Sequence, residues 1–271
     1  MKQRLITGIV LAIVLIPLLF VANIIFYSFM AFLVLLASFE MYHMIMHEKA
    51  QSERFVLMVS LPLLTFILYG ILLSVFLELL SGYMLILFAF FILVFHSIMF
   101  IFDKRYTMAE YGKMLLSTWY VAGAFAAISM VRSVGLDVLI YMLILAMLTD
   151  IFAYFAGVTF GKHKLAEDIS PKKTIEGAIG GTVVAVLVAT MYASLSALYL
   201  FNHLIVIIIA SVFVSFVAQL GDLMASKMKR EHHIKDFSNL LPGHGGILDR
   251  FDSSLFASLA LMIVIVIIEV L

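Results

Sequence analysis

Two aspartates, Asp150 and Asp222, lie inside long apolar runs of the sequence. An ionisable side chain in a membrane helix is costly unless it faces protein or water, so each aspartate is a candidate functional residue. Asp150 is followed by Ala153, Gly157 and Gly161, small residues at a spacing that lets another helix approach closely. We therefore expect close helix packing next to Asp150.

Asp222 also belongs to a stripe of polar residues. Gln219, Asp222, Ser226, Lys229 and His233 are spaced by three or four residues, which places them on one face of a helix. One interpretation is a polar seam between helices, in which Lys229 neutralises Asp222. The other is an active site, because the stripe leads directly into the most polar loop of the chain.

A second polar segment reads Ser170-Pro171-Lys172-Lys173-Thr174-Ile175-Glu176-Gly177. Ser followed by Pro is typical of a helix N-cap and first turn, which predicts that a helix begins here. Two lysines in a first turn oppose the helix dipole, and a bound phosphate would compensate for this. Contact between the lysines and anionic lipid headgroups is an equally good explanation.

The polar segment 226–250 contains Pro242-Gly243-His244-Gly245-Gly246 and Asp249. Its glycines allow backbone N–H groups to curl around an anion. Asp249 would begin the next helix, either as an N-cap with Asp252 in the capping-box position or as a ligand of a cation. The second alternative fits Mg²⁺, which is usually held beside phosphates by carboxylates from two helices.

The other ionisable residues of the apolar runs are Glu40, His43, Glu78, His96 and Glu269. They lie near the ends of the predicted helices or stand alone in the sequence. We interpret them as side chains that reach the membrane interface or make a satisfied polar contact, rather than as functional residues.

The composition indicates the environment in which these residues must be positioned. Of 271 residues, 65% are hydrophobic and 13% are charged, and the formal net charge is zero. Soluble domains are about 45–50% apolar and about a quarter charged, so most of this chain must lie in lipid or pack against segments that do. This excludes a cytosolic enzyme, a nucleic-acid-binding protein, a disordered chain and a secreted disulfide scaffold. The chain has no cysteine, which excludes thiol catalysis.

A helix needs about 20 apolar residues to cross a bilayer. The sequence predicts an all-α polytopic integral membrane protein with about nine transmembrane helices. They are expected near residues 5–21, 23–45, 55–76, 79–102, 108–131, 136–160, 174–199, 203–225 and 251–270.

The distribution of positive charge predicts the orientation. Every Lys and Arg except Arg132 falls at the N-terminus or near 46–54, 103–113, 161–173 and 226–250, segments that share one side of a nine-helix arrangement. This predicts a cytoplasmic N-terminus and a C-terminus outside. Residues 1–102 are interpreted as scaffold helices, and residues 103–271 as a catalytic region with cytoplasmic loops 161–173 and 226–250.

Segment 226–252 resembles the signature of the phosphatidate cytidylyltransferases, also called CDP-diacylglycerol synthases. That pattern is Ser-x-apolar-Lys-Arg, four free positions, Lys-Asp-x-small, two free positions, then apolar-Pro-x-His-Gly-Gly-apolar-x-Asp-Arg-apolar-Asp. Every fixed position is filled between Ser226 and Asp252. The stretch from Asp150 to Gly177 resembles the family's second recurring block, whereas the first five predicted helices agree only in being hydrophobic.

The resemblance implies a magnesium-dependent enzyme, often a homodimer, that joins CTP and phosphatidic acid to give CDP-diacylglycerol and pyrophosphate in phospholipid biosynthesis. Its site would face the cytoplasm from the bacterial inner membrane. Phosphatidic acid is already an anion and needs little activation by a base, so catalysis would consist mainly of positioning and charge neutralisation.

Residue roles follow from this resemblance and from the motifs. Asp222 and Asp249 are expected to hold one or two Mg²⁺ ions, with Lys229 and Arg230 as further catalytic residues. Substrate contacts are expected from Ser170, Lys172, Lys173, Thr174, Ser226, Lys227, Lys235, His244, Gly245, Gly246 and Arg250, and second-rank roles from Asp150, Asp236 and Asp252.

Two other functions fit part of the sequence. CTP-using polyprenol and phytol kinases have loosely similar polar loops, but they transfer the γ-phosphate to an alcohol. An ion-coupled transporter would use Asp150 and Asp222 to carry ions, although the sequence has no visible inverted repeat.

Overall fold

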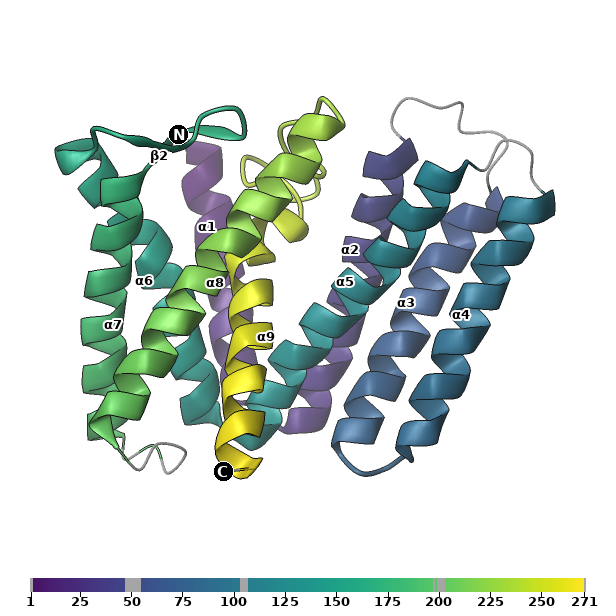
Figure 1. The fold of residues 1–271 in the computed structure, drawn as a ribbon, viewed down its shortest axis with the longest axis horizontal. Helices are drawn as coiled ribbons and strands as arrows, with labels where there is room; N and C mark the ends of the chain where they lie inside the picture. The colour runs from purple at the N-terminus through teal and green to yellow at the C-terminus, as the bar shows by residue number, and fades with distance from the viewer. Residues whose placement is uncertain (1, 47–54, 103–106, 197, 199–202, 271) are drawn as a thin grey trace. The chain divides into compact units, whose positions relative to one another are not determined.

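The computed structural model describes residues 2–46, 55–102, 107–196, 198 and 203–270. Within them the chain forms nine helices and one two-stranded antiparallel sheet (Figure 1). The helices are α1 (Lys2–Phe20), α2 (Asn23–Met46), α3 (Phe55–Phe76), α4 (Gly82–Phe102), α5 (Met108–Val134), α6 (Leu136–Phe160), α7 (Ile175–Leu195), α8 (Leu204–Glu231) and α9 (Leu248–Val270). The strands are β1 (Lys164–Ala166) and β2 (Ser170–Thr174).

The predicted all-α membrane fold is confirmed. Helices α2 to α9 contain stretches long and apolar enough to cross a membrane, and the apolar part of α1, Ile6–Phe20, is shorter. Such stretches form helices because lipid offers no hydrogen-bond partner to the backbone, so every N–H and C=O group must be satisfied within the segment. The protein is therefore an integral membrane protein. Lys49, Arg54, Lys104 and Arg105 lie outside the described residues, and the orientation of the termini stays a prediction.

The two helix boundaries next to the polar segment 226–250 differ from the sequence prediction. Helix α8 continues beyond the predicted end at 225 to Glu231, and α9 begins at Leu248 rather than at 251. The apolar run ends before α8 does, but the mostly charged residues 227–231 are good helix formers. An ion pair between Lys227 and Glu231, one turn apart at 3.3 Å, supports this last turn.

The chain divides into two compact units. Unit 1 contains residues 1–130 and 236–249, and unit 2 contains residues 131–235 and 250–271. The proposed division into scaffold helices 1–102 and a catalytic region 103–271 stays a prediction.

Unit 1 is built from helices whose contacts are mostly apolar. Helix α2 packs against α3, and α3 against α4. One polar link joins three helices in its core: the hydroxyl of Tyr69 in α3 donates to the backbone carbonyl of Tyr27 at 3.0 Å and lies 2.9 Å from the hydroxyl of Ser129. The side chain of Ser129 also donates to Phe125 one turn earlier, so this buried hydroxyl is satisfied.

Unit 2 is held together by close contacts between α6 and α7. A Cβ atom on Gly177 would lie 2.6 Å from the carbonyl oxygen of Ala153, and one on Gly181 would lie 2.5 Å from that of Thr149. These helix backbones approach so closely that only glycine fits at both positions. The predicted close packing next to Asp150 is confirmed.

Hydrogen bonds connect α8 to the other two helices of this contact. The hydroxyl of Thr149 in α6 lies 2.7 Å from that of Ser215 in α8, which donates to Thr182 in α7 at 3.1 Å. One turn further along α8, the amide of Gln219 donates to Thr182 at 2.9 Å. Such interhelical bonds between buried and half-buried polar side chains fix the register of the three helices.

Candidate active site

The polar segment between α6 and α7 forms a hairpin, and one prediction about it is wrong. Residues 170–174 form strand β2, which pairs with β1, and the helix begins at Ile175 with Thr174 as its N-cap. The hydroxyl of Thr174 accepts the N–H of Gly177 at 3.1 Å. Ser170 is therefore not the N-cap, and the adjacent lysines do not lie in a helical first turn.

The hairpin, α6, α7 and α8 surround a cavity of about 540 Å³ in unit 2. Its walls combine acidic, basic and apolar side chains, so it offers sites for both a phosphate and a hydrocarbon group. The lining residues are Asp150, Ala153, Tyr154, Gly157, Val158, Lys164, Leu165, Ser170, Lys172, Lys173, Thr174, Ala178, Gln219 and Asp222.

Five of the predicted substrate-contacting or metal-binding residues therefore share one cavity: Ser170, Lys172, Lys173, Thr174 and Asp222. They come from two segments that are about 50 residues apart in the sequence. The hairpin brings its lysines close to the polar face of α8. The sequence alone did not determine this proximity.

Lys173 forms an ion pair with Asp222 across this cavity. The two side chains retain 28% and 22% of their exposure, so the pair is neither fully buried nor fully hydrated. The hydroxyl of Ser226 donates to the other carboxylate oxygen of Asp222 at 3.4 Å. Asp222 is thus held by a charge from the hairpin and by a weak bond from its own helix.

Three carboxylates of unit 2 lie within electrostatic reach of one another. Asp150 experiences the charges of Asp222 and Lys173, and Asp252 experiences those of Asp222, Asp150 and Lys229. Lys229 is buried, whereas an exposed lysine would be expected at the end of a membrane helix. The second-rank candidates Asp150 and Asp252 therefore belong to the same acidic cluster as Asp222.

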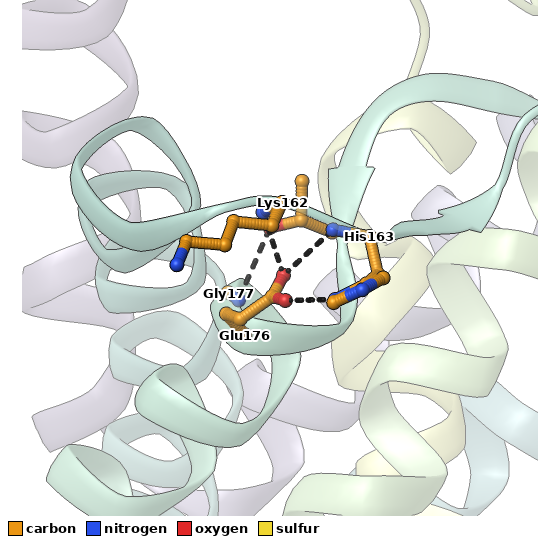
Figure 2. A network of polar contacts seen from close by, with 5 residues as sticks. Lys162, His163, Glu176 and Gly177 are labelled. Carbon is orange, nitrogen blue, oxygen red and sulfur yellow. Dashed lines mark hydrogen bonds and ion pairs between the residues drawn. The ribbon is translucent and has the colours of Figure 1, made fainter.

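A second carboxylate fixes the hairpin at its base. Figure 2 shows the side chain of Glu176, in the first turn of α7, directed at the backbone after α6. It accepts the N–H groups of Lys162 at 3.0 Å and His163 at 3.2 Å, and its other oxygen lies 2.6 Å from Nδ1 of His163. These bonds determine where β1 begins, and β1 in turn orients β2.

Residues 236–249, here named the signature loop, belong to unit 1. The loop closes on itself through Leu241, whose N–H donates to the carbonyl of Gly245 at 2.8 Å. Gly245 has a φ of 81°, in the left-handed region that favours glycine. Residues 242–246 are not helical.

Asp249 is a buried residue in the first turn of α9. Its Oδ2 accepts two backbone N–H groups of the signature loop, from Phe237 at 2.8 Å and Gly246 at 2.9 Å. The carboxylate therefore defines the shape of the loop. Its predicted pairing with Asp222 in a metal site stays a prediction.

The remaining predicted residues do not line the cavity. In unit 2, Lys227 pairs with Glu231, Arg230 donates to the backbone carbonyl of Ile234 at 3.0 Å, and Lys235 and Arg250 are exposed. In unit 1, Asp236 is exposed, whereas Nδ1 of His244 is buried with no hydrogen-bond partner among the described residues.

The described residues contain no group of three or more His, Asp or Glu side chains already arranged as a metal site. Asp150, Asp222 and Asp252 nevertheless supply the hard oxygen donors that a divalent cation such as Mg²⁺ prefers. The donor chemistry of unit 2 therefore fits this ion.

Comparison with known proteins agrees with the chemistry of the cavity. The sequence model of the cytidylyltransferase family matches residues 2–268, nearly the whole chain. The chain belongs to the cytidylyltransferase family. The family resemblance of segment 226–252 is thereby confirmed and extends over the first five helices as well, where no motif had indicated it.

Several proteins with curated names are similar to this chain. A phosphatidate cytidylyltransferase of Bacillus subtilis is 34% identical over 260 residues, which are 94% of each chain. Two proteins with the same name are similar over part of their length. The one from Staphylococcus aureus is 42% identical over 156 residues, and the one from Staphylococcus haemolyticus is 39% identical over 153 residues; each alignment covers 56% of this chain and 58% of the relative.

Sequence reasoning missed several residues of the site. Lys164, Gln219 and Tyr154 line the cavity without having been assigned a role there. Gln219 had been recognised as part of the polar stripe of α8. Lys164 could not be recognised, because β1 is too short to show the alternation of polar and apolar residues that is typical of a strand. Glu40 was interpreted as a side chain that reaches the membrane interface or makes a satisfied polar contact, rather than as a functional residue.

Proposed function

We propose that the protein is a nucleotidyltransferase that transfers the cytidine monophosphate group of CTP to phosphatidic acid. The products are CDP-diacylglycerol, a precursor for phospholipid biosynthesis, and pyrophosphate. The observation that carries the proposal is the similarity to the Bacillus subtilis phosphatidate cytidylyltransferase over 94% of both chains. The cavity of unit 2, with lysines at its polar wall, supports it independently.

The proposed reaction joins two polyanions. A phosphate oxygen of phosphatidic acid attacks the α-phosphorus of CTP, and the bond between that phosphorus and the oxygen bridging to the β-phosphate breaks. Lys164, Lys172 and Lys173 line the cavity and are positioned to reduce the repulsion between the two substrates. Because the nucleophile is already an anion, the chain needs to hold and orient it rather than to remove a proton.

We also propose that the enzyme uses Mg²⁺. Asp222 would hold the ion, with Asp150 or Asp252 of the same cluster, and Asp249 is the partner predicted from the sequence. When bound, the ion would supply positive charge to the phosphates of CTP and to the leaving pyrophosphate. Lys173 would then exchange its contact with Asp222 for a contact with a substrate phosphate.

The proposed site faces the cytoplasm from the bacterial inner membrane. CTP is a water-soluble triphosphate, whereas phosphatidic acid carries its phosphate at the membrane interface, so the reaction requires a cleft at that border. A homodimer stays a prediction.

The function is tested with purified protein in vesicles that contain phosphatidic acid, with CTP labelled at the α-phosphate in one sample and at the γ-phosphate in another. We expect the α-label in the lipid and the γ-label in free pyrophosphate, with activity lost in EDTA and restored by Mg²⁺. Transfer of the γ-label to lipid would instead indicate a kinase. Absence of both labels from the lipid would refute the proposal.

A further inference from the structure

Glu40, in the N-terminal part of the chain, accepts three hydrogen bonds from the signature loop and the start of α9. Its Oε1 accepts the hydroxyl of Ser238 at 2.7 Å and the N–H of Ile247 at 2.8 Å, and its Oε2 accepts the N–H of Leu248 at 2.9 Å. The side chain belongs to α2, about 200 residues away in the sequence, and the residue is only 5% exposed. These three donors satisfy the hydrogen-bonding requirement of a buried carboxylate.

The loop is shaped to receive this carboxylate. A Cβ atom on Gly246 would lie 2.4 Å from Oε1 of Glu40, so no larger residue fits there without displacing the carboxylate. Ser238, which donates to Glu40, also accepts the N–H of Leu240 at 3.2 Å. Contact with Glu40, rather than with a bound phosphate, therefore explains the glycine at position 246 and the serine at position 238.

Asp249 and Glu40 accept hydrogen bonds from adjacent residues of one short stretch of backbone. Asp249 accepts the N–H of Gly246, and Glu40 accepts the next two, those of Ile247 and Leu248. Leu248 is the first residue of α9, where unpaired N–H groups and the helix dipole favour a negative charge. Glu40 therefore fixes the start of the helix that carries Asp249.

We infer that Glu40 is a positioning residue for the reaction: it fixes the signature loop and the first turn of α9, and thereby the orientation of Asp249. This inference rests on the proposed function, in which Asp249 is a predicted metal ligand. It assigns a role in the reaction to α2, within the part of the chain that was interpreted as scaffold.

Replacing Glu40 by Gln tests the inference with little change in volume. Glutamine has one acceptor oxygen and one NH₂ group, whereas the site presents donors to both oxygens. At least one donor of the loop then faces another donor. Glu110→Gln is a matched control, because Glu110 is equally buried in unit 1 and accepts the N–H and hydroxyl of Thr107 at the start of α5, away from the signature loop.

Two measurements are made on both variants and on the wild-type protein. Hydrogen–deuterium exchange measures the exchange rates of the Ile247 and Leu248 amides. We expect these rates to rise roughly 10- to 100-fold in Glu40→Gln and to equal the wild-type rates in Glu110→Gln. Steady-state kinetics reports kcat and KM separately. We expect kcat to fall roughly tenfold or more in Glu40→Gln with a smaller change in the KM for CTP, because misplaced catalytic groups slow the chemical step.

Each result bears on the inference. Unchanged exchange at Ile247 and Leu248 in Glu40→Gln would overturn it, as would faster exchange with a wild-type kcat. An equal loss of kcat in Glu110→Gln would show a general effect of destabilisation and would also overturn it. A wild-type protein that transfers no cytidine monophosphate would count against the proposed function alone, and the exchange comparison would then decide the role of Glu40 in the loop.

Discussion

Replacing Lys173 by Gln removes the ammonium group that pairs with Asp222 and leaves a neutral polar side chain in the cavity. Asp222 then faces the charges of Asp150 and Asp252 without its partner from the hairpin. Both the stability of unit 2 and the activity should therefore fall, and the two effects differ in size.

The cost in stability follows from the exposure of the pair. Removal of one partner of a fully buried ion pair costs about 3–5 kcal/mol, whereas a solvent-exposed pair contributes at most about 1 kcal/mol. The two side chains retain 28% and 22% of their exposure, so a loss of about 1–3 kcal/mol is expected. The cost in activity is larger, because removal of a preorganised group that stabilises charge in the transition state lowers kcat by about 10²–10³.

The assay compares transfer of α-labelled CTP and thermal unfolding in Lys173→Gln and in Lys162→Gln. Lys162 is an exposed lysine next to the same hairpin, and it does not line the cavity. We expect Lys162→Gln to keep the wild-type kcat. A kcat within about twofold of the wild type in Lys173→Gln would refute the reasoning, since it would limit the lysine to neutralising Asp222.

Two further predictions concern the framework of the cavity. Gly181→Ala places a methyl group 2.5 Å from the carbonyl oxygen of Thr149 and should lower the free energy of unfolding by about 1–3 kcal/mol. Gly70→Ala should not destabilise, because a Cβ atom there would meet no atom within 4 Å apart from the adjacent backbone of its own helix. Thermal unfolding of both variants in one detergent measures the difference, and equal midpoints would contradict the close packing of α6 and α7. Glu176→Gln should raise the KM for CTP more than Glu167→Gln, an exposed change in the hairpin turn, because the bonds that orient the hairpin are weakened. Equal KM values in steady-state assays would exclude a role for Glu176 in orienting the lysines.

The helices could be predicted from the sequence because lipid leaves the backbone almost no alternative. Runs of about 20 apolar residues must form helices there, and the nine predicted runs correspond to α1 to α9. The start of α7 could not be located in the same way. Ser170-Pro171 and Thr174 are both good helix starts, and the choice between them depends on the pairing of β2 with β1.

The site could be predicted in part. The motifs identified Asp222, because an acidic residue in an apolar run is costly, and the hairpin lysines, because they were expected in a helical first turn where they would oppose the dipole. That Lys173 contacts Asp222 depends on how α6, α7 and α8 pack, which no local pattern contains. The role of Glu40 was missed for the same reason, since its partners lie about 200 residues further along the chain.

The central claim is that the acidic cluster around Asp222, with the lysines of the hairpin, carries out nucleotidyl transfer in the cavity of unit 2. Its most direct test is the kcat of Asp222→Asn for transfer of α-labelled CTP to phosphatidic acid in vesicles, at saturating Mg²⁺. We predict a loss of about 10²-fold or more with no loss of folded protein in the membrane fraction. Turnover near the wild-type rate would contradict the account.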